Sequence, residues 1–262
     1  MTATDSIETV LSALRSSHAR LAGAADSLTA DEVAGPSYCD EWSIAQVLSH
    51  LGSGAEIFDM VLDAGLRGDP APGTEQFQQV WDRWNAKSPQ DQARDGVAAD
   101  AAFLDRLDAL SPAQRTQWRI SMFGGEQTLS DMARMRLSEH ALHTWDIAVA
   151  LDSKATVAGD AAELILDILP GLAARAGKPA GQDLHVHVTT DDPGRSFQLD
   201  AGPDSVSLSP AGPEHTAGGA GLRLPAEALV RLVYGRLDPE HTPPVESEHV
   251  ELDTLRRVFP GF

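Results

Sequence analysis

The sequence predicts an α+β protein, in which a long helical region precedes a small domain that contains both helices and strands. Through the first 177 residues, apolar side chains recur at helical spacing and are interrupted only by short turn segments. At residues 184–189 (Leu-His-Val-His-Val-Thr) the period changes to two, which is typical of a strand. We therefore expect a helical bundle over residues 1–177 and a small α+β domain over residues 178–262.

The helical region contains clear start signals for its helices. Thr29–Glu32 and Ser43–Gln46 are capping boxes, in which a hydroxyl and a Glu or Gln side chain can satisfy the free N–H groups of a first turn. Ser111 followed by Pro112 is a further start signal. A turn is expected over residues 65–73, which are rich in Gly and Pro. The expected helices cover 5–28, 44–64, 75–110 with a break near Ser88-Pro89, about 128–150, and 157–175 with a kink at Pro170-Gly171.

The second region alternates strand patterns with turns rich in Asp, Gly and Pro. The expected strands cover 184–189, 196–199, 205–208 and 222–224. A helix is expected to begin at Pro225 and to end at Gly235, because Gly readily adopts the left-handed conformation that closes a helix. A last helix is expected over residues 250–258.

Composition limits the partners. The chain has 262 residues and a formal net charge of −19, which argues against nucleic acids and anionic membranes, since both are polyanions. Cys39 is the single cysteine, so no disulfide can form within the chain. The first residues lack the pattern of a secretory signal, and no apolar run approaches the roughly 20 residues of a membrane span. We expect a soluble, cytoplasmic protein that is a monomer or a small homo-oligomer.

The predicted helix with Glu139 and His143 carries the strongest chemical signal. These residues are four apart, so they lie on one face, one turn from each other. The same face carries the apolar residues Met132, Met135, Ile147 and Ala150. A carboxylate and an imidazole on such a face are costly unless something satisfies them, and a divalent metal would do so.

His50 is the third candidate ligand, beside the apolar stripe of the predicted 44–64 helix. Metal sites in helix bundles are built from side chains on facing helices. Two imidazoles and a carboxylate suit zinc and other mid-series divalent ions, and three protein ligands leave a fourth position open. Two alternatives stay open here: His140 could replace Glu139 as the partner of His143, and a core histidine is commoner than a ligand.

Several short segments, in order and spacing, resemble one known family. In the helical region they are residues 42–51 (Trp-Ser-Ile-Ala-Gln-Val-Leu-Ser-His-Leu) and 139–146 (Glu-His-Ala-Leu-His-Thr-Trp-Asp). In the second region they are residues 184–187, 232–237 and 255–259. Together they resemble the mycothiol-dependent maleylpyruvate isomerase family, whose N-terminal domain belongs to the wider DinB-like metalloenzyme superfamily. The resemblance implies a DinB-like four-helix bundle followed by the family's small second domain.

The resemblance also implies ligands, a cosubstrate and an activity. The family's metal ligands carry over onto His50, Glu139 and His143, the residues that helical spacing already favours. Its functional arginine carries over onto Arg236, as a catalytic and cofactor-binding residue that could clamp a carboxylate through its bidentate fork. The thiol cosubstrate would be mycothiol, and a thiol bound to zinc is deprotonated to the nucleophilic thiolate. The alternative for Arg236 is a solvated arginine that follows a helix end.

Three functions are compatible with this sequence. An isomerase would add the thiolate to a conjugated double bond of a small electrophile and then expel it. An S-transferase would use the same thiolate to displace a leaving group or to add irreversibly. A non-catalytic metal or small-molecule binding protein of the same fold would keep the apolar stripe but lack a pocket for the electrophile.

Four further residues have two interpretations each. Asp146 could accept a hydrogen bond from a ligand histidine or could form a surface pair. Cys39, in the loop before the predicted helix with His50, could approach the candidate site, but it is interpreted as structural or incidental. His185 and His187 share one face of a predicted strand and could form a metal pair, although the outer face of a small sheet is the commoner place for such residues.

Overall fold

The computed structural model describes residues 6–181, 183–212 and 219–261. The chain divides into two compact units, Met1–Ala155 and Thr156–Phe262. The α+β fold class is confirmed: the first unit is a helical bundle with one hairpin, and the second combines a sheet with helices. The sequence placed a domain boundary after residue 177, whereas the compact units divide at residue 155. The difference arises because the helices between these positions pack on elements of the second unit.

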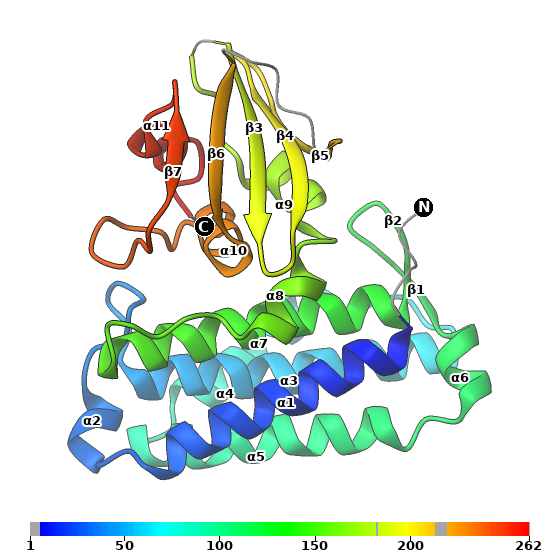
Figure 1. The fold of residues 1–262 in the computed structure, drawn as a ribbon. Helices are drawn as coiled ribbons and strands as arrows, with labels where there is room; N and C mark the ends of the chain where they lie inside the picture. Colours follow the sequence, from blue (N-terminus) through cyan, green and yellow to red (C-terminus); the bar gives the residue numbers. More distant parts are fainter. Residues whose placement is uncertain (1–5, 182, 213–218, 262) are drawn as a thin grey trace. The chain divides into compact units, whose positions relative to one another are not determined.

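Four long helices form the bundle of the first unit and run side by side (Figure 1). They are α1 (Ile7–Asp26), α3 (Ile44–Arg67), α5 (Pro89–Asp108) and α7 (Leu129–Leu151). Helices α1 and α3 each contact both α5 and α7. Shorter elements connect the long helices: α2 (Ala30–Ala34), α4 (Thr74–Asn85), α6 (Pro112–Gln117), and a hairpin of β1 (Arg119–Met122) and β2 (Gly125–Thr128).

The predicted start signals of the helices are confirmed. Ser43 Oγ accepts from the Gln46 N–H over 3.2 Å, and Gln46 Oε1 accepts from the Ser43 N–H over 2.8 Å. The box at Thr29 and Glu32 forms in the same way. Ser88 caps α5, so the predicted break between α4 and α5 is also confirmed.

Two predicted helix boundaries were wrong for identifiable reasons. Helix α3 continues three residues past position 64, so Gly65 lies inside the helix, where it permits close packing: a Cβ there would lie 2.3 Å from Trp118 Nε1. The helix ends instead at Gly68, whose φ is +73°. The expected 157–175 helix is split before Pro170, which sits in the first turn of its second half, where a proline loses no hydrogen bond. Along the described chain, no helix is both long and apolar enough to cross a membrane.

The bundle positions His50 through close packing of α3 on α5. A Cβ at Gly96 of α5 would lie 2.4 Å from the Leu48 carbonyl oxygen, so only glycine permits this approach. The neighbouring core cluster on α3 includes Leu48 and Leu51, which flank His50 and are almost fully buried. His50 is therefore fixed between two core residues while its ring reaches the edge of the core.

The second unit is a five-stranded sheet with the order β5-β4-β3-β6-β7 and helices packed on it. Strands β3 and β6 are parallel and the other pairs are antiparallel. The strands are β3 (Leu184–Asp191), β4 (Arg195–Ala201), β5 (Val206–Pro210), β6 (Ala220–Pro225) and β7 (Glu246–Glu248). The helices are α8 (Gly159–Ile165), α9 (Leu169–Ala176), α10 (Ala226–Val233) and α11 (Leu252–Val258).

The burial pattern of the sheet explains which strands could be predicted. Alternate residues of β3 and β4 are buried, and Val186 of β3 pairs with Leu199 of β4. Helix α10 packs against β3 and β6, and Gly235 follows it with φ +71°, as predicted. Strand β7 was not predicted, because all three of its residues are exposed and polar and leave no hydrophobic alternation.

Candidate metal centre

His50, Glu139 and His143 meet at one place in the first unit. Glu139 Oε2 lies 3.3 Å from His50 Nε2 and 3.7 Å from His143 Nε2. The two imidazole rings are 4.6 Å apart between their centroids. Side-chain exposure is 33% for His50, 43% for Glu139 and 11% for His143, so the cluster opens to solvent on one side. The three candidates thus converge from α3 and α7.

The chemistry and spacing of these donors fit a divalent metal. Zinc takes imidazole nitrogen and carboxylate oxygen at about 2.0–2.2 Å, so neighbouring donors of a tetrahedral site lie about 3.3 Å apart. The observed separations from Glu139 Oε2, 3.3 and 3.7 Å, are close to this spacing. The ligand atoms of all three residues lie within 4.8 Å of one another. Three protein ligands would leave a fourth coordination position for a bound ion.

Asp146 orients the His143 ring through the ring nitrogen that does not face Glu139. His143 Nδ1 donates to Asp146 Oδ2 over 2.8 Å, which leaves Nε2 facing Glu139. Asp146 is fully buried, so the interpretation as a surface pair was wrong. A carboxylate that accepts from the second ring nitrogen of a histidine is the usual support of a metal-binding histidine.

Cys39 takes part in the same arrangement. Its Sγ donates to Asp146 Oδ2 over 3.1 Å and lies 3.9 Å from His143 Nδ1. The interpretation of Cys39 as structural or incidental did not include this contact. Sequence reasoning missed it because the contact joins residues 107 positions apart.

Hydrogen bonds to carboxylates control the protonation of the cluster. Burial lowers the pKa of His143, but its bonds to Asp146, Cys39 and Glu139 outweigh burial and raise the pKa to about 10. Burial would raise the pKa of Glu139, but bonding to His143 and His50 lowers it well below its usual range. At neutral pH the metal-free cluster therefore holds a carboxylate beside a protonated imidazole.

The loop of residues 35–43, between α2 and α3, contacts α7 next to the cluster. The Tyr38 N–H donates to the Asp146 carbonyl over 3.0 Å, and the Tyr38 ring packs edge-on against Trp145 at 4.7 Å. Glu41 adopts a positive φ of +67° within the loop. Trp42 follows, and its ring lies 5.3 Å from that of His50 and 6.3 Å from that of His143. Trp42 is 37% exposed and forms one wall of the cluster.

His140 belongs to a different cluster and faces away from Glu139. It is fully buried, and its Nε2 lies 2.9 Å from Asp100 Oδ2 while Nδ1 accepts from Ser17 Oγ over 2.8 Å. An Nδ1 that accepts a hydrogen bond carries no proton, so the His140 ring is neutral. Burial lowers the pKa of His140 and so favours this neutral form. His140 therefore does not take the place of Glu139 beside His143.

The remaining candidates lie in the second unit. Arg236 is half-buried just after Gly235, and its Nη1 donates to the Tyr234 carbonyl over 3.2 Å. His185 is exposed, and its Nδ1 lies 2.7 Å from Asp200 Oδ1. Among the described residues, neither His185 nor His187 belongs to a group of three or more potential metal ligands.

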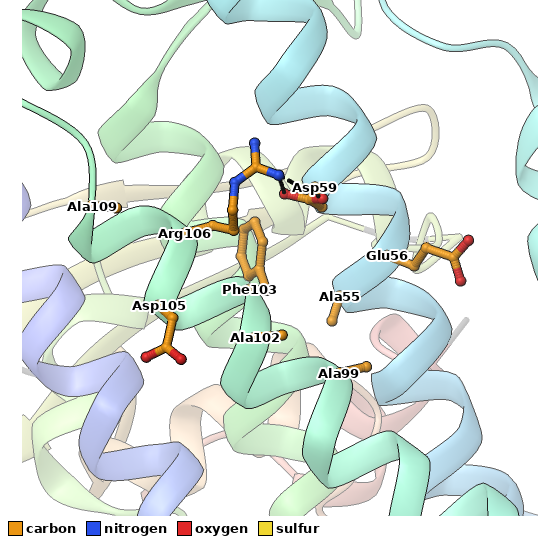
Figure 2. Close-up of a pocket in the computed structure, with 9 residues that line it drawn as sticks. All are labelled: Ala55, Glu56, Asp59, Ala99, Ala102, Phe103, Asp105, Arg106 and Ala109. Carbon is orange, nitrogen blue, oxygen red and sulfur yellow. Dashed lines mark hydrogen bonds and ion pairs between the residues drawn. The ribbon is translucent and has the colours of Figure 1, made fainter.

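A separate groove of about 540 Å³ lies between α3 and α5 (Figure 2). Phe103 and several alanines line it, together with Arg106 and Asp59, which form an ion pair at 3.2 Å. Burial raises the pKa of Asp59, which Arg106 opposes. The lining residues do not include the three metal-ligand candidates, so the groove is distinct from the candidate metal centre.

Comparisons with known proteins identify the family of this chain. The family model described as "Mycothiol maleylpyruvate isomerase N-terminal domain" matches residues 14–148, which include all three candidate ligands. Two solved structures are similar: the mycothiol-dependent maleylpyruvate isomerase and a histidine-to-alanine mutant of it. Each has a TM-score of 0.67 and 16% identity, over 94% of this chain and 95% of that chain. No curated protein sequence gives a significant match. Since the family model spans more than half of the sequence, the chain belongs to the mycothiol maleylpyruvate isomerase N-terminal domain family.

Proposed function

We propose that this protein is a metal-dependent enzyme that uses mycothiol to isomerise a small conjugated electrophile. His50, Glu139 and His143 hold the metal, and zinc is the favoured ion. The observation that carries the proposal is the convergence of these three donors at a spacing close to that of a tetrahedral site. Family membership and the names of the two similar structures support the thiol and the reaction type.

Each residue of the centre has a defined task in this proposal. A bound divalent metal would supply stabilisation of a thiolate at neutral pH. Asp146 keeps the proton of His143 on Nδ1, so that Nε2 is free to act as a ligand. The Trp42 ring lies beside the rings of His50 and His143 and limits the access of water to the thiolate.

The reaction conserves the thiol and the mass of the substrate. The thiolate adds to one carbon of a conjugated double bond, and the adjacent carbonyl accepts the electron pair. The remaining single bond rotates, the electron pair returns, and the thiolate leaves. We propose that Arg236 binds a substrate or mycothiol carboxylate, because its guanidinium matches a carboxylate in geometry and charge.

The test uses the zinc-loaded protein with mycothiol and maleylpyruvate. Proton NMR should show conversion of the cis double bond to the trans isomer with substoichiometric thiol, and mass spectrometry should show no adduct. Replacement of His50 by Ala should abolish conversion. Replacement of Arg236 by Ala should raise KM more than it lowers kcat, while the exposed arginine variant Arg223→Ala of the same unit serves as the control.

The other outcomes assign the protein to its alternatives. A stable thiol adduct that accumulates with the electrophile would indicate an S-transferase. Zinc binding with neither conversion nor adduct, over a panel of conjugated and halogenated electrophiles, would indicate a non-catalytic binding protein. Conversion that persists in the His50→Ala variant would contradict the proposed metal role.

A further inference from the structure

A buried network around one carboxylate, Asp100, joins all four long helices of the bundle. Asp100 of α5 accepts from Arg136 Nη2 over 2.6 Å at one oxygen. Its other oxygen lies 2.8 Å from His18 Nδ1 of α1 and 2.9 Å from His140 Nε2 of α7. Arg136 Nη2 also donates to the Leu51 carbonyl of α3 over 2.9 Å. Asp100, Arg136 and His140 are each at most 1% exposed.

This network adjoins the metal centre along both helices that supply its ligands. On α3, the Leu51 carbonyl that Arg136 holds is next to His50. On α7, His140 is next to Glu139, and Arg136 lies one turn before Glu139. A shift of α7 past α3 would therefore have two effects at once: it would break the Arg136 contacts, and it would separate Glu139 from His50.

Glycine at position 54 makes room for Arg136. A Cβ at Gly54 would lie 2.8 Å from Arg136 Nη1, which is closer than such atoms come without movement. By contrast, a Cβ at Gly23, also in a helix, would meet no atom within 4 Å. The path of the Arg136 side chain thus depends on a residue of α3, four positions after His50.

The Asp100 cluster does not suit a metal ion. His18, Asp100 and His140 lie close enough to be ligands. However, the Arg136 guanidinium already supplies a positive charge 2.6 Å from Asp100, and a divalent ion would meet it at close range. The cluster therefore serves to hold helices rather than a second ion.

We propose that the Asp100–Arg136 network is a positioning device for the metal centre, which sets the separation of His50 from Glu139 and His143. This inference rests on the proposed metal function. It assigns to Arg136 a role beyond packing: loss of its contacts loosens the ligand geometry even where the bundle stays folded. Partners that orient metal ligands usually affect affinity by about 10–100-fold.

The test compares the full chain with Gly54→Ala, Gly23→Ala and Arg136→Lys variants, with Co²⁺ and Zn²⁺ as probes. Gly54→Ala displaces the guanidinium without removing a group, and Gly23→Ala is the matched glycine control. Arg136→Lys keeps the positive charge but lacks the planar fork. Circular dichroism establishes that each variant is folded, competition with a chromophoric chelator gives Kd, and the visible Co²⁺ spectrum reports ligand geometry.

We expect Gly54→Ala and Arg136→Lys to raise Kd about tenfold or more and to change the Co²⁺ spectrum, while Gly23→Ala matches the wild type. Wild-type Kd and spectrum in folded Gly54→Ala and Arg136→Lys would overturn the inference and leave the proposed function intact. A second bound equivalent that is lost in a His18→Asn variant would also overturn it. A wild-type chain that binds neither ion would overturn the inference and the proposed metal function together.

Discussion

His143 Nδ1 donates to Asp146 Oδ2 over 2.8 Å, and the accepting carboxylate is completely buried. The bond sets the direction of the imidazole, because the other ring nitrogen must then face Glu139. It also sets the charge of the ring, since it favours the protonated form when no metal is bound. This one contact therefore affects both the orientation of His143 as a ligand and the proton that His143 must lose when a metal binds.

Replacement of Asp146 by Asn should weaken metal binding about 10–100-fold. The amide keeps the shape of the carboxylate but loses its charge, so the His143 ring is less firmly held and less basic. Chelator competition at pH 7.5 measures the change in Kd. Asp63→Asn, a half-exposed acid on α3, controls for loss of charge. Equal affinities of wild type and Asp146→Asn would refute the orienting role.

Metal affinity should rise with pH, by about tenfold per unit between pH 7 and 9. His143 must lose a proton before Nε2 can bind a metal, and its pKa is raised to about 10 in the metal-free protein. Calorimetry in two buffers of different ionisation enthalpy should show the release of about one proton per metal at pH 7.5. A flat pH profile with no proton release would contradict this.

The metal-free protein should lose stability as the pH rises. The folded pKa of His143 lies above its ordinary value of about 6.5, so its stabilising contribution is complete below pH 6.5 and is lost as the pH passes through about 10. The loss should be on the order of a few kcal/mol. Chemical denaturation of wild type and His143→Gln between pH 6 and 10 tests this, and parallel profiles of the two proteins would speak against it.

Replacement of Cys39 by Ala should weaken metal binding by less than Asp146→Asn does. The substitution removes one of the bonds to the Asp146 carboxylate, while the backbone bond from Tyr38 to Asp146 remains. We expect an increase in Kd of about two- to tenfold, since a thiol is a weak donor. Cys39→Ser keeps a donor at this position and should restore most of the affinity. A loss in Cys39→Ala as large as that in Asp146→Asn would mean that the thiol does more than support Asp146.

Replacement of Gly96 by Ala should destabilise the bundle by about 1–3 kcal/mol. The new Cβ would lie 2.4 Å from a backbone oxygen, the Leu48 carbonyl, which cannot rotate away as a side chain can. Urea denaturation of the metal-free protein measures the change in the free energy of unfolding. Gly23→Ala, which meets no neighbour, should be neutral or stabilising, and an equal effect of the two substitutions would argue against close packing of α3 on α5.

Local signals in the sequence predicted much of the fold. The capping boxes at Ser43 and Thr29 marked helix starts correctly, because they depend on residues three apart. The continuation of α3 past residue 64 could not be predicted in this way, since Gly65 looks like a helix end in the sequence and its packing against Trp118 is visible only in the structure. The β1–β2 hairpin was not predicted, because each strand has only four residues and most of them are exposed or half-buried.

The candidate ligands followed from helical spacing and resemblance, but their surroundings did not. The placement of Glu139 and His143 on one face needs only the period of a helix. The contacts of Cys39 and of Asp100 join residues far apart in the chain, so they become visible only when the helices are packed. His140 illustrates the limit: it adjoins Glu139 in sequence, yet its side chain enters the core on another face.

The metal content of the reconstituted protein tests the central claim most directly. Native mass spectrometry after zinc loading and removal of excess ion should show one zinc per wild-type chain. The folded variants His50→Ala, Glu139→Gln and His143→Gln should each lose it, while His185→Ala retains it. A wild-type chain without zinc, or zinc that persists in all three ligand variants, would contradict a metal centre at these residues.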